Sequence, residues 1–410
     1  AYTAYPHPEY EFSLLGNDFV PTSLSIKDVS SLNLYNWSDR EISKIAPSLW
    51  LGYYNVIAQC DVLLERMDNV KTSSTEEQNE KQTITAEAKT LKALCYFQLL
   101  KVFAPAYDLN PDAPGVILKT HLGIEDKQRS SIRDCVSTIR GLLSDAVQMD
   151  GTSRHNGWLS KTAVLYLQAD VALYSGDYET AITSGNAVIA KANDAYFTSE
   201  GISNLWAKDS YAGRIFAFNT NSTYYSNIQF SMQEGDYFCV NPKLNVGTSD
   251  LRYTSFTYPF VMNGTVRTLL GKYNRCNKLN QTTAYINTMR YAGAYYIVAE
   301  AYCRKGETEA ARVLINHYWH CIGVSEAPAG ITNQALLELI LTDKQREFVG
   351  EGVNFFDLKR THLTSLPRYS QWGTGASSSI SSTDYRWNFP IPVSEYRFNS
   401  VEQNAGWPSN

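Results

Sequence analysis

Two stretches share one pattern: LYLQADVALYSGDYETAI at residues 165–182 and YYIVAEAYCRKGETEAAR at residues 295–312. In both, an alanine precedes a glycine by seven residues, and a second alanine follows the glycine five residues later. The matching positions are Ala169 and Ala299, Gly176 and Gly306, Ala181 and Ala311, Tyr166 and Tyr296, and Asp170 and Glu300. Small side chains let two helices approach closely, and glycine permits a tight turn. Each stretch therefore predicts a helix, a turn and a second helix.

The repeated unit is typical of tetratricopeptide-like (TPR-like) scaffolds, in which each helix pair buries its apolar face against the next. Two weakly similar copies do not prove a regular solenoid, and the less favoured alternative is two unrelated helical hairpins. Under the first interpretation, Ala169 and Ala299 lie buried at helix–helix contacts.

Helical spacing of apolar residues extends outward from the repeat in both directions. It predicts helices at residues 50–67, 84–103, 132–149, 161–175, 178–191, 290–305, 308–321 and 333–349. Their short connections favour antiparallel neighbours. By contrast, residues 219–284 are rich in Asn, Thr, Tyr and Gly, and residues 367–410 combine a Gly/Ser run with several prolines. We expect loops and short strands there, packed on the scaffold because aromatic residues are dense.

These observations predict a mainly α fold, with a TPR-like paired-helix scaffold and an irregular, loop-rich subdomain carrying short strands. We expect an N-terminal part at residues 1–218 and a C-terminal part at residues 219–410. The latter divides into an irregular insert at 219–285, further scaffold helices at 286–365 and an irregular tail at 366–410. Apolar residues in the tail, among them Phe389, Ile391 and Trp407, predict that it is fixed on the scaffold.

The composition narrows the function. The 410 residues carry 36 Lys and Arg against 41 Asp and Glu, a net charge of −5, which argues against a nucleic-acid binder. No apolar run reaches the roughly 18 residues of a membrane-spanning helix. Tyr is unusually frequent at 28 residues, which favours a polar, aromatic binding surface.

The seven cysteines lack zinc-site spacing. Four of them fall among apolar helical residues, so we expect these to be core residues without disulfides; they are Cys60, Cys95, Cys135 and Cys303.

Enzyme and metal signatures are weak. The chain has no GxSxG, HExxH, GxGxxG or Walker motif. His317 and His320 are spaced like metal ligands, and Cys321 follows them. Because the sequence does not identify a third ligand, we expect neither a metal nor a cofactor. The acidic run at Asp108, Asn110 and Asp112 is interrupted by proline, which favours an Asx turn over a calcium loop.

A pair of carboxylates could also indicate a glycosidase. Glu347 and Glu351 lie one helical turn apart, and Asp357 follows. Basic residues are interleaved with them, namely Arg346, Lys359 and Arg360. This arrangement favours a structural cluster of ion pairs at a helix end.

Several segments resemble the RagB/SusD family, the surface nutrient-binding lipoproteins of Bacteroidetes. The segment 343–360 (DKQREFVGEGVNFFDLKR) resembles the family's "ER..El..EG.R..DL.R" block, and 388–407 (NFPIPVSEYRFNSVEQNAGW) resembles its "PIP..E...N..l.QN.Gy" tail. Further matches are the helix at 86–100, the Trp50, Tyr54 and Ile57 pattern, and Arg290 with the Ala299–Glu300–Ala301 segment. The chain departs at Lys92, Trp319, Cys321 and Asn354, where the family has arginine, which indicates a locally rewired ion-pair network. The chain is also short for the family, and we expect the shortage in the irregular part.

The resemblance implies a non-catalytic surface lipoprotein that binds an oligosaccharide and delivers it to a SusC-like, TonB-dependent outer-membrane transporter. Its lipidated cysteine and signal peptide would precede residue 1, so the lipid anchor would be its attachment to the outer membrane at the cell surface. Two alternatives remain open: a peptide-binding member of the same family, and an α-helical glycoside hydrolase.

No family binding residue maps onto a fixed motif, so the ligand contacts are predicted from side-chain chemistry. The segment 32–40 (LNLYNWSDR) precedes the first long predicted helix and is polar. Within it, Trp37 could stack on a sugar face, while its neighbours could bond hydroxyl groups; these are Tyr35, Asn36, Asp39 and Arg40. The alternative is that Trp37 is tucked onto the scaffold. The insert supplies a second aromatic wall, namely Tyr224, Tyr225, Tyr253 and Tyr258.

Overall fold

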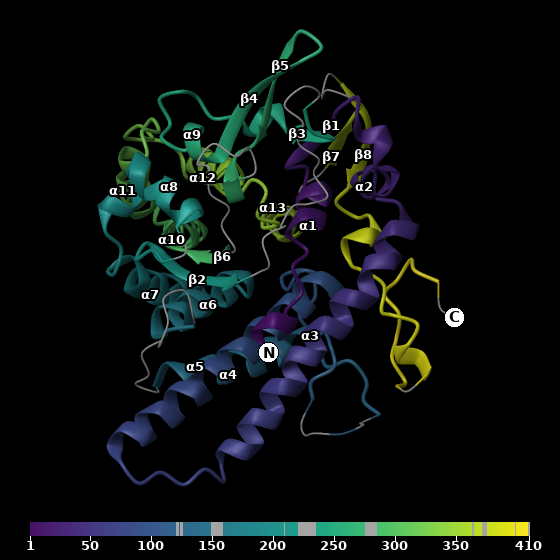
Figure 1. The fold of residues 1–410 in the computed structure, drawn as a ribbon, viewed down its shortest axis with the longest axis vertical. Coiled ribbons are helices and arrows are strands. Elements are labelled where there is room, and N and C mark those ends of the chain that lie inside the picture. Colours follow the sequence, from purple (N-terminus) through teal and green to yellow (C-terminus); the bar gives the residue numbers. More distant parts are fainter. Residues whose placement is uncertain are drawn as a thin grey trace. The chain divides into compact units, whose positions relative to one another are not determined.

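The protein is described by a computed structural model (Figure 1). It describes residues 1–408 except 120–122, 124–125, 149–158, 209, 220–234, 275–284, 363–364, 371–374 and 398. The chain forms two compact units that are each discontinuous in sequence. Unit 1 comprises residues 1–7, 39–184 and 383–410, and unit 2 comprises residues 8–38 and 185–382. The unit boundaries therefore fall elsewhere than at residue 218.

Unit 1 is built on a run of long helices that pack in sequence order, α3 (Asp39–Met67) on α4 (Thr75–Phe103), α4 on α5 (Ile132–Gln148), and α5 on α6 (Lys161–Tyr174). Figure 1 shows α3 and α4 side by side as an antiparallel pair. Trp50 of α3 is buried edge-on against Phe103 of α4 at a ring-centroid distance of 4.9 Å. The short helix η1 (Tyr2–Ala4) packs on α3.

The C-terminal tail of unit 1 is fixed on α4, as the sequence predicts. The backbone N–H of Phe389 donates to the Val102 carbonyl at 3.0 Å. Asn404 donates its amide to the carbonyls of Phe103, at 2.8 Å, and Phe389. Trp407 is buried. Two short 3-10 helices complete the tail, η7 (Tyr385–Trp387) and η8 (Glu395–Arg397).

In the part that the structure describes, unit 2 combines helices with four two-stranded antiparallel sheets. The strands pair as β1 (Phe19–Pro21) with β3 (Phe238–Val240), β2 (Arg214–Asn219) with β6 (Tyr285–Arg290), β4 (Thr257–Met262) with β5 (Thr265–Leu270), and β7 (Ser365–Tyr369) with β8 (Ala376–Ser381). The α-helices are α1 (Glu9–Leu15), α2 (Val29–Tyr35), α8 (Ser199–Ala207), α9 (Tyr253–Phe256), α10 (Tyr291–Lys305), α11 (Thr308–Cys321), α12 (Asn333–Glu347) and α13 (Asn354–Arg360). The 3-10 helices are η2 (Ser25–Lys27), η3 (Asp194–Phe197), η4 (Pro242–Leu244) and η5 (Lys272–Asn274). Helix α7 (Tyr178–Ile189) crosses the boundary between the units.

Helix α10 is the centre of unit 2, and it packs against both α11 and α12. All but three of its fifteen residues are buried. Its C-terminal cap, Gly306, takes a φ of +81°, a conformation that side chains with a Cβ disfavour. The turn to α11 therefore forms where the repeat predicts it.

The predicted mainly α class, with short strands in the irregular part, is confirmed, and Ala169 and Ala299 are both fully buried. Cys60, Cys95, Cys135 and Cys303 are buried as expected. Asp112 lies in an Asx turn, its N–H donating to the Asn110 side chain at 3.1 Å, while its carboxylate binds Arg133. Within the described residues, no helix is both long and apolar enough to cross a membrane.

Candidate binding site

Trp37 lies in the core of unit 2, so the prediction that it stacks on a sugar is wrong. Its side chain is fully buried, and its indole N–H donates to the Leu15 carbonyl at 3.2 Å. The ring packs against Phe355 at 5.9 Å, and the guanidinium of Arg368 lies over it at 5.5 Å. The segment 32–40 is mostly helical, because α2 ends at Tyr35 and α3 begins at Asp39, and only residues 36–38 connect them. Trp37 is therefore a core residue of unit 2.

Tyr35 is fully buried as well and contributes to the same core. Its hydroxyl accepts the backbone N–H of Tyr369 at 2.9 Å and lies 3.3 Å from the Asn17 side-chain oxygen. A ligand cannot reach this phenol without unfolding the core, so Tyr35 is also corrected to a structural residue.

The other predicted contacts have mixed surroundings. Asn36, Asp39 and Arg40 are exposed, although Asp39 accepts the Tyr385 hydroxyl at 2.6 Å. Tyr253, on α9, and Tyr258, on β4, are half-buried, and Tyr258 packs against the cluster of Val20, Cys239 and Leu269. Tyr224 and Tyr225 lie outside the described residues.

A different feature of unit 2 is a small pocket that opens to solvent, in which the centre of a water-sized sphere can occupy about 20 Å³. It is formed mainly by η3, α8, the segment before β2, and the junction of β6 with α10. Its lining is largely aromatic and apolar, with one guanidinium, one carboxylate and several phenols. The residues are Tyr196, Phe197, Ile202, Leu205, Tyr211, Gly213, Phe256, Arg290, Tyr291, Ala292, Tyr318 and Glu347.

Three tyrosines pack on one another within this lining. The rings of Tyr196 and Tyr291 are stacked, with centroids 5.5 Å apart and an interplanar angle of 26°. Tyr211 meets Tyr196 edge-on at 5.9 Å. Gly213 makes this possible, because a Cβ there would lie 2.5 Å from a ring carbon of Tyr211 and 3.1 Å from the Tyr196 ring. Burial raises the pKa of Tyr211 and of Tyr291, so both phenols stay protonated and can donate hydrogen bonds.

Arg290 and Glu347 supply the charge in the pocket, and each is already paired. Glu347 accepts hydrogen bonds from Arg290 at 2.7 Å, from Arg252 at 2.9 Å and from the Tyr318 hydroxyl at 3.0 Å. Burial alone would raise the pKa of Glu347, but the guanidinium groups of Arg290 and Arg252 outweigh it and hold the pKa at about 2. The carboxylate is therefore ionised at neutral pH and oriented by its partners.

The pair belongs to a larger buried network of charges. Arg252 also binds Asp250 and Asp343, at 2.6 and 2.7 Å. Glu351 binds Lys272 at 2.6 Å and Arg290 at 2.9 Å. The interpretation of Glu347 and Glu351 as structural ion-pair residues is thus confirmed. Their partners are Arg252, Lys272 and Arg290 from distant segments rather than the interleaved Arg346 and Lys359.

A second cluster holds Asp357, which binds Lys344 at 2.8 Å and Arg360 at 2.7 Å. Arg360 in turn donates two hydrogen bonds of 2.6 Å to the carboxylate of Glu300 on α10. Asp357 is therefore the third structural carboxylate that the sequence predicts.

The family departures are accommodated as a rewired network. Trp319, in place of an arginine, donates its indole N–H to Asp343 at 2.8 Å. Asn354 donates to the carboxylate of Asp18 at 2.7 Å and to the Gln345 carbonyl at 2.9 Å. In unit 1, Lys92 forms an ion pair with Asp61. These three substitutes each supply at least one N–H donor to an acceptor, whereas the side chain of Cys321 supplies none.

Sequence reasoning missed the tyrosines of the pocket. Tyr196 and Tyr211 lie fifteen positions apart in a segment for which no helix or site is predicted, and Tyr291 begins α10. The surplus of tyrosine was the only sequence signal, and it does not say which tyrosines meet.

Comparisons with known proteins fit this architecture. Residues 150–407 match the model described as the SusD family, and residues 2–155 match a model described as "Starch-binding associating with outer membrane". Because the first match covers more than half of the chain, the chain belongs to the SusD family. A search among curated proteins gave no match.

Solved structures share the fold at low sequence identity. A putative sugar binding protein from Bacteroides vulgatus is 20% identical with a TM-score of 0.80, over 99% of this chain and 96% of that one. A SusD-like carbohydrate binding protein from the same species is 19% identical, with a TM-score of 0.79 over 95% and 90% of the two chains. A SusD superfamily protein from Bacteroides thetaiotaomicron is 22% identical, with a TM-score of 0.73 over 87% and 84%.

Proposed function

We propose that this protein binds an oligosaccharide, without chemical change, on the tyrosine-bearing surface of unit 2 where this pocket opens. Membership of the SusD family and the description of the model matching residues 2–155 support a glycan ligand. So do the carbohydrate-binding names of two solved structures of the same fold.

The observation that carries the proposal is the pairing of stacked tyrosines with neutral hydroxyl donors. A sugar ring offers an apolar C–H face and a rim of hydroxyl groups. Tyr196 and Tyr211 are half-buried, so their rings keep surface that such a face can cover. The phenol groups of Tyr211 and Tyr291 are protonated and suit the hydroxyl rim.

The state of Glu347 argues against hydrolysis in this pocket. A glycoside hydrolase needs one carboxylic acid that holds its proton near neutral pH. The pKa of Glu347 is held at about 2, and its two oxygens accept three hydrogen bonds. This carboxylate can orient a ligand but has no proton to give to a leaving group.

Delivery to a SusC-like, TonB-dependent outer-membrane transporter, and anchoring at the cell surface by an N-terminal lipid, are parts of the same proposal. Their support is the family and the outer-membrane description of the matching model. Asn36, Asp39, Arg40, Tyr253 and Tyr258 remain predicted ligand contacts, second to the pocket.

The test is calorimetric titration of the purified protein with a panel of neutral oligosaccharides and a panel of peptides. A ligand that stays partly solvated should bind with about 4–6 kcal/mol, a Kd from about 1 mM down to tens of micromolar. Replacing Tyr196 by alanine should weaken glycan binding by roughly 1 kcal/mol. The matched control Tyr196→Phe keeps the ring and should retain most of the affinity.

Three results would contradict the proposal. Glycan binding that is unchanged in Tyr196→Ala would move the site out of the pocket. Binding of peptides but of no glycan would favour the peptide-binding alternative. Release of shortened products during incubation with oligosaccharides would establish a hydrolase.

A further inference from the structure

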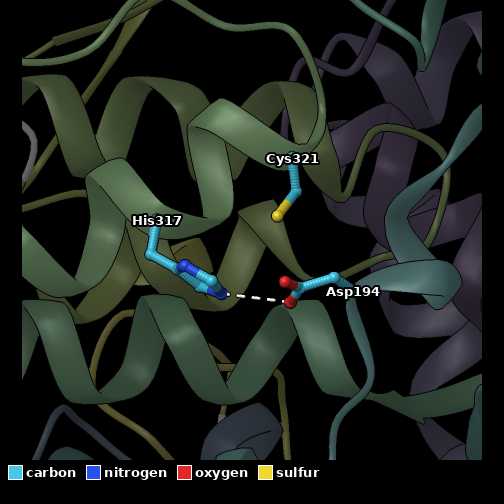
Figure 2. Close-up of side chains that lie close together, drawn as sticks. All are labelled: Asp194, His317 and Cys321. Carbon is cyan, nitrogen blue, oxygen red and sulfur yellow. Dashed lines mark hydrogen bonds and ion pairs between the residues drawn. The ribbon is translucent and has the colours of Figure 1, made fainter.

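Three side chains with different donor atoms converge on the surface of unit 2. Figure 2 shows His317 and Cys321 on one helix, α11, facing Asp194 at the start of η3. His317 and Cys321 are four residues apart and therefore share a helix face. The sequence pairs His317 with His320 instead, but His320 binds Glu326 at 3.3 Å. Asp194, more than a hundred residues earlier, is the neighbour that sequence spacing could not supply.

The distances suit a single cation. One ligand atom from each residue lies within 4.8 Å of the other two. One contact joins Nε2 of His317 to Oδ1 of Asp194 at 3.1 Å. Around a tetrahedral Zn²⁺, with bonds of about 2.0–2.3 Å, such donor atoms lie roughly 3.3–3.6 Å apart. Side-chain adjustments of about an ångström are enough to reach that geometry.

The backbone that carries these residues is held by aromatic packing. Phe197 of η3 packs edge-on against Tyr295 at 5.6 Å and Tyr318 at 5.0 Å, which fixes η3 on α10 and α11. The Tyr295 ring lies nearly parallel to the imidazole of His317, with centroids 6.1 Å apart. The backbone at these residues is therefore already ordered before a cation binds. Binding then loses little conformational entropy, which lets a set of only three ligands bind well.

The cluster is also open to solvent. The side chains of His317 and Asp194 are 49% and 65% exposed, so a cation can enter and water can complete its coordination. Cys321 is partly exposed, whereas the other cysteines that the structure describes are buried. An Asp–His contact at such exposure contributes little to stability as an ion pair, so the arrangement is not explained by folding alone.

We propose that Asp194, His317 and Cys321 bind a divalent transition-metal cation of the Zn²⁺ type. The donor set of one imidazole nitrogen, one carboxylate oxygen and one sulfur suits a borderline-soft ion, whereas Ca²⁺ and Mg²⁺ prefer oxygen ligands throughout. On binding, the thiol proton of Cys321 leaves to solvent and the sulfur bonds to the metal as thiolate. The cation joins η3 to α11, and η3 also carries Tyr196 and Phe197 of the pocket.

The first test is titration of tag-free, chelator-treated protein with ZnCl₂. One Zn²⁺ should bind per chain, and Cys321→Ser or His317→Ala should weaken binding at least about tenfold. The matched control is His320→Ala, on the same helix and more exposed, which should bind as the wild type does. With Co²⁺ as the probe, a sulfur-to-cobalt charge-transfer band should appear in the wild type and be lost in Cys321→Ser.

The second test measures thiol protection, which does not depend on glycan binding. In a Cys276→Ser background, which removes the one cysteine outside the described residues, a thiol reagent should modify Cys321 readily. Saturating Zn²⁺ should slow that reaction, and Asp194→Asn should reduce the protection. Absence of Zn²⁺ binding by the wild type, binding that survives Cys321→Ser, or equal loss in His320→Ala would each overturn the assignment. Circular dichroism of every variant separates lost ligation from lost folding.

Discussion

The two copies of the repeat share a backbone but differ in the chemistry they carry. Ala169 and Ala299 are both fully buried, and Gly176 and Gly306 both take positive φ, at +78° and +81°. The corresponding acidic residues diverge, because Asp170 is half-buried whereas Glu300 is fully buried. One sequence pattern therefore builds two similar turns with different side-chain roles.

The second copy is the one that anchors charge inside unit 2. Glu300 accepts two bonds of 2.6 Å from Arg360 and a further bond of 3.0 Å from Arg304. Tyr296, one turn earlier, donates its hydroxyl to Asp343 at 2.6 Å. Small residues and glycine therefore specify the turn between the paired helices, while the larger polar positions determine which charged partners the helices bind.

The largest expected difference between the copies concerns these acidic positions. Glu300→Gln leaves the largely buried guanidinium of Arg360 with Asp357 as its remaining counter-charge, which should cost about 3–5 kcal/mol of unfolding free energy. Asp170→Asn, at the half-buried position, should change it by less than about 0.5 kcal/mol. Urea denaturation of both variants measures the two effects. Equal losses would mean that the copies do not differ in this way.

Acid should reveal the second copy's network without mutation. Guanidinium groups hold the pKa of Glu347 at about 2 against the raising effect of burial, and Lys344 and Arg360 do the same for Asp357. Because the folded pKa lies below the unfolded value, each carboxylate stabilises the fold above about pH 4.5. That stabilisation, about 3 kcal/mol for Glu347, is lost as pH falls towards 2.

The carboxyl group of Asp18 should have the opposite effect on the pH dependence of stability, because it should lower the free energy of unfolding as pH rises towards neutral. Burial raises its pKa to about 7 despite hydrogen bonds from Gly350 and Asn354. The folded state therefore favours the protonated acid, and stability falls as pH rises from about 4 to 7. Together, the two effects predict a melting temperature that peaks near pH 5. Glu11, whose pKa burial likewise raises to about 7, contributes to the same slope. Asp18→Asn should therefore make the neutral side of the curve less steep and leave the acid side intact; an unchanged neutral side would contradict this assignment.

Crowding at the paired alanines should affect both copies. Ala169→Leu and Ala299→Leu each add three carbons to a fully buried site, which should cost roughly 1–3 kcal/mol. Ala299 should be the more sensitive, because its helix α10 is buried on almost every side. Thermal midpoints measured side by side check the prediction. An unchanged midpoint for both variants would count against helix packing at these alanines.

Local signals made the helix pairs predictable. The predicted helix at 308–321 agrees with α11 (Thr308–Cys321), and that at 290–305 agrees with α10 (Tyr291–Lys305) to one residue. Apolar spacing and a glycine turn are both contained within a few residues of the elements they define. The first turns of α3 and α4 are polar and lack the apolar spacing that predicts a helix, so the sequence prediction begins both helices too late. The N-terminus of α4 is instead marked by its cap, Ser74, which accepts the Glu77 N–H at 3.2 Å.

The site was harder to predict because its contacts are distant in sequence. Trp37 is buried by Phe355 and Arg368, more than three hundred residues away. Nothing in the polar segment around Trp37 indicates those partners. The pocket tyrosines meet in the same way across separate elements, so the sequence could predict an aromatic ligand surface but not its members.

The smallest expected effect is the one that should be equal in both copies. At Gly176 and Gly306 an added Cβ would meet no atom within 4 Å, so only the backbone conformation resists substitution. The hydrogen bonds also match: each glycine N–H donates to the carbonyl three residues earlier, Leu173 or Cys303. Gly176→Ala and Gly306→Ala should therefore each cost about 1 kcal/mol, the penalty of a left-handed alanine. The two losses should agree within about 0.5 kcal/mol in urea denaturation, since neither site involves packing. A difference of more than about 1 kcal/mol would show that the turns differ as well as the side chains. If the two glycine variants lose equal unfolding free energy while Glu300→Gln loses far more than Asp170→Asn, the two copies differ only at their polar positions.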